Sequence, residues 1–353
     1  MNKSVYLESL DRLSQELDAT PNTLMGMTFK VLTLAVMNMR YEKIALDSSG
    51  GRHPYARVRD LIEEQRLFFR AVVDILFIED PSGAEAPRGK QAALEGRHQE
   101  LFNVIWDKYD DSAYDTYVDR YIHRLKVNGL ENLVKGKRCL DLGCGNGNFC
   151  FALASEGAAE AVGVDFGDRS IAFAKKQRAR RPEGARVSFH VSTVYALPFP
   201  DASFDFVIQN GVFHHLDDED RAIREAKRVL KPGGWFWYYT DGEGGISYDL
   251  WDRSVFLLRD VPIDLIRGVF QRLNVSVGKL AHLMDGLNAV YRHTSWARIT
   301  ERLSAAGFGE FRRLTGGFAT DFDLDHIKSD PFGHEKFGEG DLRVLARKCL
   351  RGL

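Results

Sequence analysis

Short apolar runs alternate with helical spacings through the middle of the chain. Runs that suit strands lie near residues 137–142, 160–165, 186–191, 204–209 and 234–240, and apolar residues recur at helical intervals between them. A continuous apolar run is typical of a strand buried on both faces, and strands that alternate with helices form parallel sheets. With a further helix at 296–306 and strands at 310–314 and 342–347, the pattern predicts an α/β fold with a doubly wound, mostly parallel, seven-stranded sheet.

The segments around this core have a different pattern. Residues 1–78 show amphipathic helical spacing and predict a helical accessory domain, whereas prolines and glycines predict a linker over 79–100. Residues 243–292 are apolar at helical intervals and too long for a simple connection. We interpret them as a helical cap or lid; a structural insertion or a homodimer surface is the alternative. The predicted core then comprises residues 101–242 and 293–353, and begins with a helix over 101–125.

Composition narrows the class of protein. The 353 residues carry 48 Lys and Arg against 50 Asp and Glu, so the net charge of −2 offers no basic field for a nucleic-acid partner. The most apolar early stretch, residues 28–39, is too short to span a membrane and contains Lys30. The four cysteines show no metal-ligand spacing, so we expect no metal and no disulfide framework. We therefore expect a cytoplasmic enzyme with reduced thiols.

A glycine-rich turn follows the first strand of the core. Residues 140–147 read Leu-Asp-Leu-Gly-Cys-Gly-Asn-Gly and place glycines at 143, 145 and 147, between a strand and a helix. Residues without a Cβ let a ligand approach the backbone, and the N–H groups at the start of the next helix attract a carboxylate or phosphate. The Asp141 carboxylate would pair with a ligand ammonium or hold the turn by accepting hydrogen bonds from its backbone N–H groups. The segment predicts a nucleoside cofactor.

A second carboxylate fits two classes of nucleoside cofactor, so it does not by itself decide between them. Asp165 ends the second strand about twenty residues past the first glycine, where an acid can accept hydrogen bonds from ribose hydroxyls. Dinucleotide-binding proteins share this acid but need a third glycine where this chain has Asn148. A nicotinamide-dependent oxidoreductase is therefore the weaker alternative.

Five motifs in order carry a resemblance to a known family. They are Asp141 to Gly147, Val164-Asp165-Phe166, Leu197-Pro198-Phe199 with Ser203 to Val207, Gly211 to Leu216, and Arg228 to Gly234. In these motifs the chain resembles the class I S-adenosylmethionine (SAM)-dependent methyltransferases, and among them the small-molecule group called type 11. The resemblance covers residues 137–240 well and 294–348 loosely. It implies a Rossmann-like sheet closed by an antiparallel hairpin, and methyl transfer from SAM to an oxygen, nitrogen or carbon of a small molecule, with S-adenosylhomocysteine (SAH) as product.

The resemblance also implies which residues bind the cofactor. They are Asp141, Gly143, Cys144, Gly145, Asn146, Gly147, Asp165, Phe166, Thr193, Val194, Gln209 and Asn210. Many relatives have an aspartate for the adenine amino group after the third strand, where this chain has Ser192-Thr193-Val194. We therefore expect adenine to rely on backbone groups near Val194 and on packing against Phe166. In relatives the preceding helices cover the cofactor, which makes Tyr109, Tyr117 and Arg120 candidates for contacts with its amino-acid end.

Candidate catalytic residues follow the fourth and fifth strands. In-line displacement requires alignment of the acceptor, and a base where the acceptor carries a proton. His215 matches a histidine that phosphoethanolamine methyltransferases use, and we predict that it is this base. His214 is the second candidate. For both histidines the alternative is a structural role in holding the loop by hydrogen bonds, and for His214 this role is favoured. Tyr239, with Tyr238 and Asp241 beside it, lines the acceptor pocket or assists proton removal, with a place in the core as the alternative for the tyrosines. His190, on the third strand, is predicted to be a packed histidine.

Other functions remain as alternatives. A catalytically silent protein that binds SAM or SAH for regulation would keep all of these motifs. An RNA or protein methyltransferase would show a basic groove or an Asn-Pro-Pro-Tyr motif, and this chain has Gln209-Asn210-Gly211 instead. We predict a small-molecule acceptor as the partner.

Overall fold

The computed structural model describes residues 1–76, 111–275 and 277–350. They divide into two compact units. The helical unit contains described residues of 1–94 together with 244–289 and 327–338, and the sheet unit contains described residues of 95–243, 290–326 and 339–353. The predicted linker and Tyr109 lie outside the described residues.

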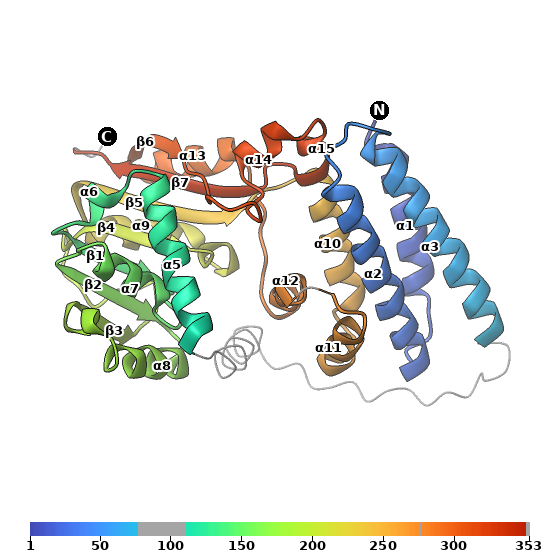
Figure 1. The fold of residues 1–353 in the computed structure, drawn as a ribbon, viewed down its shortest axis with the longest axis horizontal. Coiled ribbons are helices and arrows are strands. Elements are labelled where there is room, and N and C mark those ends of the chain that lie inside the picture. The colour runs from blue at the N-terminus through green and yellow to red at the C-terminus, as the bar shows by residue number, and fades with distance from the viewer. Residues whose placement is uncertain (77–110, 276, 351–353) are drawn as a thin grey trace. The chain divides into compact units, whose positions relative to one another are not determined.

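Seven strands form the single sheet of the sheet unit (Figure 1). Their order is β3-β2-β1-β4-β5-β7-β6, in which β1 to β5 run parallel and β7 runs antiparallel to both of its neighbours. The doubly wound, seven-stranded prediction and its closing hairpin are therefore confirmed. The strands are β1 Arg138–Leu142, β2 Glu160–Asp165, β3 Val187–Val191, β4 Phe204–Asn210, β5 Leu230–Asp241, β6 Phe308–Arg313 and β7 Asp341–Lys348.

Each face of the sheet has its own apolar core because successive strand residues point to opposite faces. In β1, Cys139 belongs to one core and Leu140 to the other. The first core is completed by α5 (Asp111–Val127), α7 (Asn148–Ser155) and α8 (Asp168–Arg178). The second is completed by α9 (Glu219–Val229) and α13 (Trp296–Ala305). The short α6 (Glu131–Val134) precedes β1, and the 3₁₀ turn η1 (Pro182–Arg186) precedes β3.

One minor prediction about this sheet is wrong. His190 was expected to be packed, but it is exposed, and its ring meets Phe199 edge-on with 5.6 Å between ring centroids. The reason is that β3 is an edge strand, so the end of the strand is not covered on both faces.

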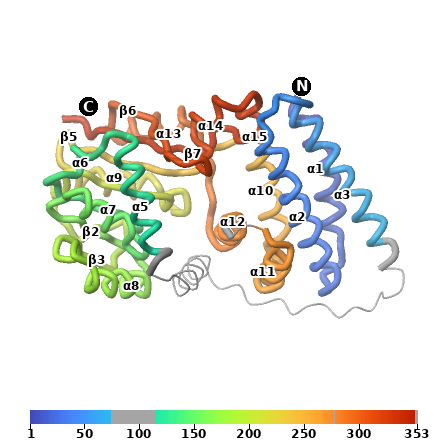
Figure 2. Tube along the Cα trace, in the orientation of Figure 1, coloured from blue at the N-terminus to red at the C-terminus, as the bar shows by residue number. Residues whose placement is uncertain are grey.

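Helices from three parts of the sequence build the helical unit. The N-terminal helices are α1 (Ser4–Asp18), α2 (Leu24–Ala45) and α3 (Pro54–Leu76), which confirms the predicted helical N-terminal region. Residues 244–289 add α10 (Gly245–Leu258), α11 (Ile263–Arg272) and α12 (Val277–Asn288), and α15 (Gly333–Phe337) completes the unit. Figure 2 shows α2 beside α10 and α11 within this unit. The helix α14 (Leu324–Ser329) spans the boundary between the units.

A buried ion pair joins distant segments of the helical unit. The Lys336 ammonium lies 2.7 Å from Asp330 and donates to the carbonyl oxygen of Asp47 at 2.6 Å. The Tyr41 hydroxyl donates to the carbonyl oxygen of Lys336 at 3.0 Å. The N-terminal helices and residues 327–338 therefore share polar contacts that neither segment satisfies alone. Among the described helices, none has the length and apolarity to cross a bilayer.

Candidate functional site

The glycine loop, residues 143–147, connects β1 to α7 and is held by backbone hydrogen bonds. The N–H groups of Gly143 and Cys144 both donate to the carbonyl oxygen of Val164, at 2.7 and 3.0 Å. Gly143 (φ +72°) and Gly147 (φ +86°) adopt left-handed conformations that favour glycine. A Cβ on Gly147 would lie 2.5 Å from the Phe189 ring, so this position also lacks space for a side chain.

Asp165 connects the end of β2 to the glycine loop. One carboxylate oxygen accepts from the N–H of Gly145 at 2.9 Å, and the other accepts from the N–H of Gly167 at 2.7 Å. A carboxylate has about four acceptor positions, so these bonds are compatible with further ones to ligand hydroxyls. The Asp165 carboxylate is therefore fixed in orientation by the backbone on both sides.

Asp141 is a buried acid on the same loop. Its side chain is 3% exposed, and the Cys150 thiol faces it at 3.8 Å. Burial raises the pKa of Asp141 to about 7, and the nearby charge of Asp165 adds to this effect. Burial also raises the pKa of the Cys144 thiol well above its usual value, so this cysteine is a poor nucleophile.

Two tyrosines of α5 contact this region. The Tyr114 hydroxyl donates to the carbonyl oxygen of Asn146 at 2.8 Å, and the Tyr121 ring stacks on Phe149 of α7 with 4.4 Å between centroids. The sequence candidates on α5 lie elsewhere: Tyr117 is 37% exposed, and Arg120 donates to Asp321 at 3.2 Å. Sequence reasoning missed Tyr114 and Tyr121. Their seven-residue spacing, which places them on one face of a helix, was the available signal.

Apolar and exposed side chains surround the carboxyl ends of β2 and β3. Phe166 is 50% exposed and Val191 is 54% exposed, an unusual position for two large apolar side chains. Val194 is buried, and Thr193 is exposed and accepts from the N–H of Tyr195 at 3.3 Å. The ends of these strands therefore present a partly open apolar surface beside Asp165.

Gln209 of β4 organises the turn that carries the two histidines. The side chain is fully buried, accepts from the N–H groups of Val212 and Phe213 at 3.0 and 3.2 Å, and donates to the carbonyl oxygen of Tyr239 at 2.8 Å. Val212 in turn packs on the glycine loop, since a Cβ on Gly143 would lie 2.5 Å from its side chain. The structure thus places Gln209 as a support for the 3₁₀ turn η2 (Phe213–His215), which ties this turn to the glycine loop.

His214 and His215 lie side by side in η2. Their ring centroids are 4.0 Å apart, and the Tyr291 ring contacts both, at 4.8 and 4.9 Å. His214 is 4% exposed, whereas His215 is half-buried. The Nδ1 atom of His215 lies 2.9 Å from the carbonyl oxygen of Val290. Because a carbonyl oxygen only accepts, Nδ1 carries the proton of the neutral ring and Nε2 is the basic nitrogen.

A network of tyrosines and acids lies at the end of β5 beside this turn. The Tyr239 hydroxyl is 3.2 Å from Asp241 and 3.5 Å from Asp341, and the Tyr291 hydroxyl donates to the other carboxylate oxygen of Asp241. Asp241 and Asp341 are directly opposite each other in the β5–β7 register. Burial raises the pKa of Asp341, against the opposing effect of Arg343, and the charge of Asp241 raises it further.

Cations complete this tyrosine–aspartate network. Arg343 donates to Asp341 and to Asp321, both at 3.1 Å, and Arg124 of α5 donates to Asp321 at 2.8 Å. The Asn210 amide at the end of β4 donates to the Tyr121 hydroxyl at 3.3 Å. The sequence analysis named Tyr239 and Asp241 but missed Tyr291, Asp341 and Arg343. They lie 52 to 104 residues from Tyr239, and nothing in the local sequence marked them.

The chain is similar to known methyltransferases. Residues 140–238 match the family described as a methyltransferase domain. The ubiquinone/menaquinone biosynthesis C-methyltransferase UbiE of Geotalea uraniireducens is 31% identical over 228 residues, which cover 63% of this chain and 93% of that protein. The 27-O-demethylrifamycin SV methyltransferase of Amycolatopsis mediterranei is 34% identical over 137 residues, which are 38% of this chain and 49% of that protein. The chain thus spans about half the length of this second relative.

Solved structures show a looser likeness. The 1,6-didemethyltoxoflavin-N1-methyltransferase of Burkholderia thailandensis, solved with 1,6-didemethyltoxoflavin and SAH, is 17% identical, with a TM-score of 0.42 and coverage of 77% of this chain and 97% of that chain. The sequence match to the Geotalea protein over nearly its whole length is the stronger finding. The chain belongs to the SAM-dependent methyltransferases, as its five ordered motifs predict.

Proposed function

We propose that this protein transfers a methyl group from SAM to an oxygen, nitrogen or carbon nucleophile of a small-molecule acceptor. The observation that carries the proposal is the glycine loop, which is fixed by Asp165 on one side and packed against Val212 of the histidine turn on the other. This arrangement places a cofactor-type loop and a candidate base at the carboxyl ends of adjacent parallel strands, where such sheets bind their ligands.

Polar groups on the loop fit the amino-acid end of SAM. Among the described residues, the buried Nδ2 of Asn146, Oδ1 of Asn148 and Oδ1 of Asn210 have no hydrogen-bond partner. Buried polar atoms without partners are costly, and a ligand's carboxylate and ammonium would satisfy donors and acceptors of this kind. Asp141, buried beside a thiol, gains a cationic partner when an ammonium binds. The residues present therefore fit the cofactor.

The nucleoside end fits the neighbouring strands. The orientation of Asp165 is fixed, and a carboxylate at this place suits the two ribose hydroxyls. The exposed Phe166 ring and the buried Val194 offer the apolar surface on which adenine would pack. Thr193 contributes an exposed hydroxyl where many relatives carry an aspartate, so the adenine amino group gains a weaker partner here.

The acceptor would lie between the histidine turn and the tyrosine–aspartate network. When bound, SAM supplies an electrophilic methyl group on a sulfonium sulfur. We propose that Nε2 of His215 receives the proton that the acceptor loses, because the Val290 carbonyl keeps the other ring nitrogen protonated. Tyr239, which is held by Asp241 and Asp341, would orient the acceptor, and His214 supports the turn.

Two measurements test the proposal in sequence. Calorimetry with SAH should show saturable binding, and Asp165→Ala should weaken it about 100-fold or more, since the variant loses both the ribose acceptor and the support of the loop. The matched control is Asp168→Ala, because Asp168 is exposed in the first turn of α8 and lies close in sequence. Incubation with SAM that carries an isotopically labelled methyl group and a cell extract should then label a small molecule, which mass spectrometry detects.

The outcomes separate the competing functions. Absence of SAH binding to the folded protein would contradict the cofactor site. Tight binding without labelled product across the extract and a broad acceptor panel would favour a silent SAM- or SAH-binding regulator. Label that appears in RNA or protein instead of a metabolite would contradict the small-molecule acceptor.

A further inference from the structure

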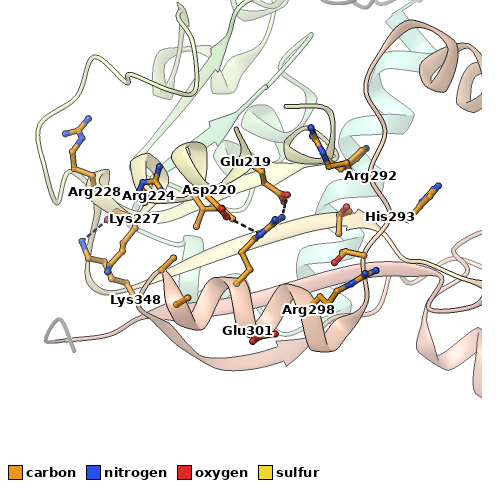
Figure 3. A pocket seen from close by; sticks show the side chains of 17 residues that line it. Glu219, Asp220, Arg224, Lys227, Arg228, Arg292, His293, Arg298, Glu301 and Lys348 are labelled. Carbon is orange, nitrogen blue, oxygen red and sulfur yellow. Dashed lines mark hydrogen bonds and ion pairs between the residues drawn. The ribbon is translucent and has the colours of Figure 1, made fainter. Parts of the chain in front are cut away.

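A cavity lies within the sheet unit, between α9 and α13 (Figure 3). Its volume is about 910 Å³, and Ile223, Ala305 and Ala306 contribute its apolar lining. The two helices cover the face of the sheet opposite to that covered by α5, α7 and α8. We call this cavity the basic groove, and the methyl-transfer chemistry proposed above does not use it.

The charge of the basic groove differs from that of the whole chain. Seven lysines and arginines line it against three acids, an excess of four positive charges in a chain whose net charge is −2. Among the described residues, four of these cations have no acidic partner within ion-pair distance: Arg224, Lys227, Arg292 and Lys348. Partial burial lowers the pKa of Lys348, and the nearby charge of Lys227 lowers it further.

Some of these cations have structural roles. Lys348 donates to the carbonyl oxygens of Lys227 and Leu230 at 2.7 and 2.6 Å, and so caps the end of α9. Arg292 donates to the carbonyl oxygen of Leu216. Among the described residues, Arg224 makes no hydrogen bond of this kind, and its side chain is exposed. The Lys227 ammonium makes none either and lies against Gly307. Basic residues near the C-terminal end of α9 also complement the helix dipole, but this does not explain the cations contributed from outside α9.

The cations are spread along the groove and do not converge on one point. Figure 3 shows Arg224, Lys227 and Lys348 at one end and Arg292 and His293 at the other. Between them, Arg302 of α13 pairs with Glu219 and with Asp220 of α9, the latter at 3.1 Å. A phosphate site brings several donors to one anion. Separated single cations instead suit an elongated ligand that carries several separated negative charges.

We propose that the basic groove is a docking site for an acidic, amphipathic helical segment of a partner protein. A helix with its side chains is about 10–12 Å wide, so the cavity volume corresponds to about two helical turns. The apolar stripe of such a helix would pack on Ala305 and Ala306, which are accessible, while its carboxylates pair with Arg224 and Lys227.

The lining favours a protein segment over a nucleic acid. Three acids line the groove among its cations and would pair with occasional basic residues of a helix, which a phosphate backbone does not have. The described lining contains no Phe, Tyr or Trp on which a base would stack. The groove also reaches His214, whose ring centroid lies 4.0 Å from that of His215, so a docked helix would contact the histidine turn.

A labelled peptide tests the proposal on the full chain. The probe is an acidic, amphipathic peptide of about 15 residues, the length at which an isolated helix becomes marginally stable. Fluorescence anisotropy at low ionic strength should show saturable binding that weakens as salt is added. The double variant Arg224→Glu/Lys227→Glu should weaken binding about tenfold or more. The matched control Lys175→Glu/Lys176→Glu changes the net charge equally on exposed positions of α8 and should stay within about twofold of the unmodified protein.

Several outcomes would overturn the proposal. They are absence of saturable binding, equal losses in both double variants, equal binding of a peptide with the same residues in scrambled order, and tighter groove-dependent binding of single-stranded RNA or inorganic polyphosphate. Thermal unfolding would confirm that the variants fold. If the charge-reversal variant does not fold, Arg224→Gln/Lys227→Gln takes its place, with a required loss of about threefold or more. Because the readout is binding of the peptide, the result does not depend on methyl transfer.

Discussion

The glycine loop and the tyrosine–aspartate network lie at the carboxyl ends of β1 and β5, which β4 separates in the sheet, and they are built in different ways. Residues 141–167 supply the loop and the acid that fixes it, and backbone N–H groups make most of its hydrogen bonds. The network instead joins side chains from α5, β5, Tyr291, Asp321 and β7. The glycine loop thus depends on local backbone geometry, whereas the tyrosine–aspartate network depends on contacts between distant residues.

The two regions should respond differently to substitution. Backbone contacts fix the glycine loop in one conformation, so one added atom disturbs all of it. In the network, Asp321 has three arginine partners, and the loss of a peripheral one leaves the others. Each prediction below separates the contribution of one region from that of the other.

The largest expected effect is a loss of turnover from a substitution at His215, on the acceptor side, that leaves cofactor binding nearly unchanged. His215→Asn keeps an amide donor for the Val290 carbonyl but cannot accept a proton, so kcat should fall about 100- to 1,000-fold. SAH affinity, measured by calorimetry, should change by less than about threefold. Unchanged turnover would remove His215 from the mechanism and favour Asp241 as the base.

Gly143→Ala should affect the glycine loop and the histidine turn next to it at once. The left-handed conformation and the contact of the new Cβ with Val212, at 2.5 Å, disturb the glycine loop and the histidine turn together. We expect SAH affinity to fall about 100-fold and stability to fall by about 2–4 kcal/mol. Gly136→Ala is the matched control, because Gly136 has a similar φ of +70° and no atoms within 4 Å of the added Cβ. Similar losses in the two variants would show that the Val212 contact is unimportant.

A pH series tests Asp141 on the cofactor side. Its pKa in the folded protein is about 7, so a cationic ligand should bind more tightly as pH rises through 7, by up to about tenfold per unit below that value. The raised pKa also means that the folded state holds an extra proton between the ordinary value of 3.8 and 7. The stability of the free protein should therefore fall as pH rises through this range. Asp141→Asn should flatten both profiles, as measured by calorimetry and thermal unfolding; an unchanged slope would assign the titration to another group.

The smallest expected effect is at the edge of the network. Arg120 is about one third exposed, and Asp321 keeps Arg124 and Arg343 when Arg120 is removed. Arg120→Ala should therefore cost less than about 1 kcal/mol in denaturant unfolding and change kcat by less than about threefold. A loss above about 2 kcal/mol would show that the network is not redundant and that each cation is required.

Sequence reasoning was most successful where function depends on consecutive residues. The strands, their mostly parallel order, the glycine loop and the family all follow from short motifs and apolar runs, because a buried parallel strand and a strand-to-helix turn have local signatures. Asp165 could also be identified in this way, since its distance along the chain from the glycines is characteristic. The specific roles proposed for these residues await the experiments above.

The predictions were weaker where a contact required two distant segments. Gln209 was assigned to the cofactor, but its side chain hydrogen-bonds the backbone of η2 and β5 in this structure. The basic groove was also missed, because a net charge near zero averages its cations with acids elsewhere. Local charge depends on which helices pack side by side, and overall composition does not contain that information.

The sequence by itself determined the fold class, the glycine loop and the family, because local backbone preferences and apolar periodicity act over a few residues. Only the tertiary structure decided that Val212 joins the glycine loop to the histidine turn, that Tyr239 lies between Asp241 and Asp341, and that α9 and α13 enclose a basic groove. The physical reason is the same in each case. Packing brings together side chains that are far apart in the chain, and burial and mutual charge then set their chemistry.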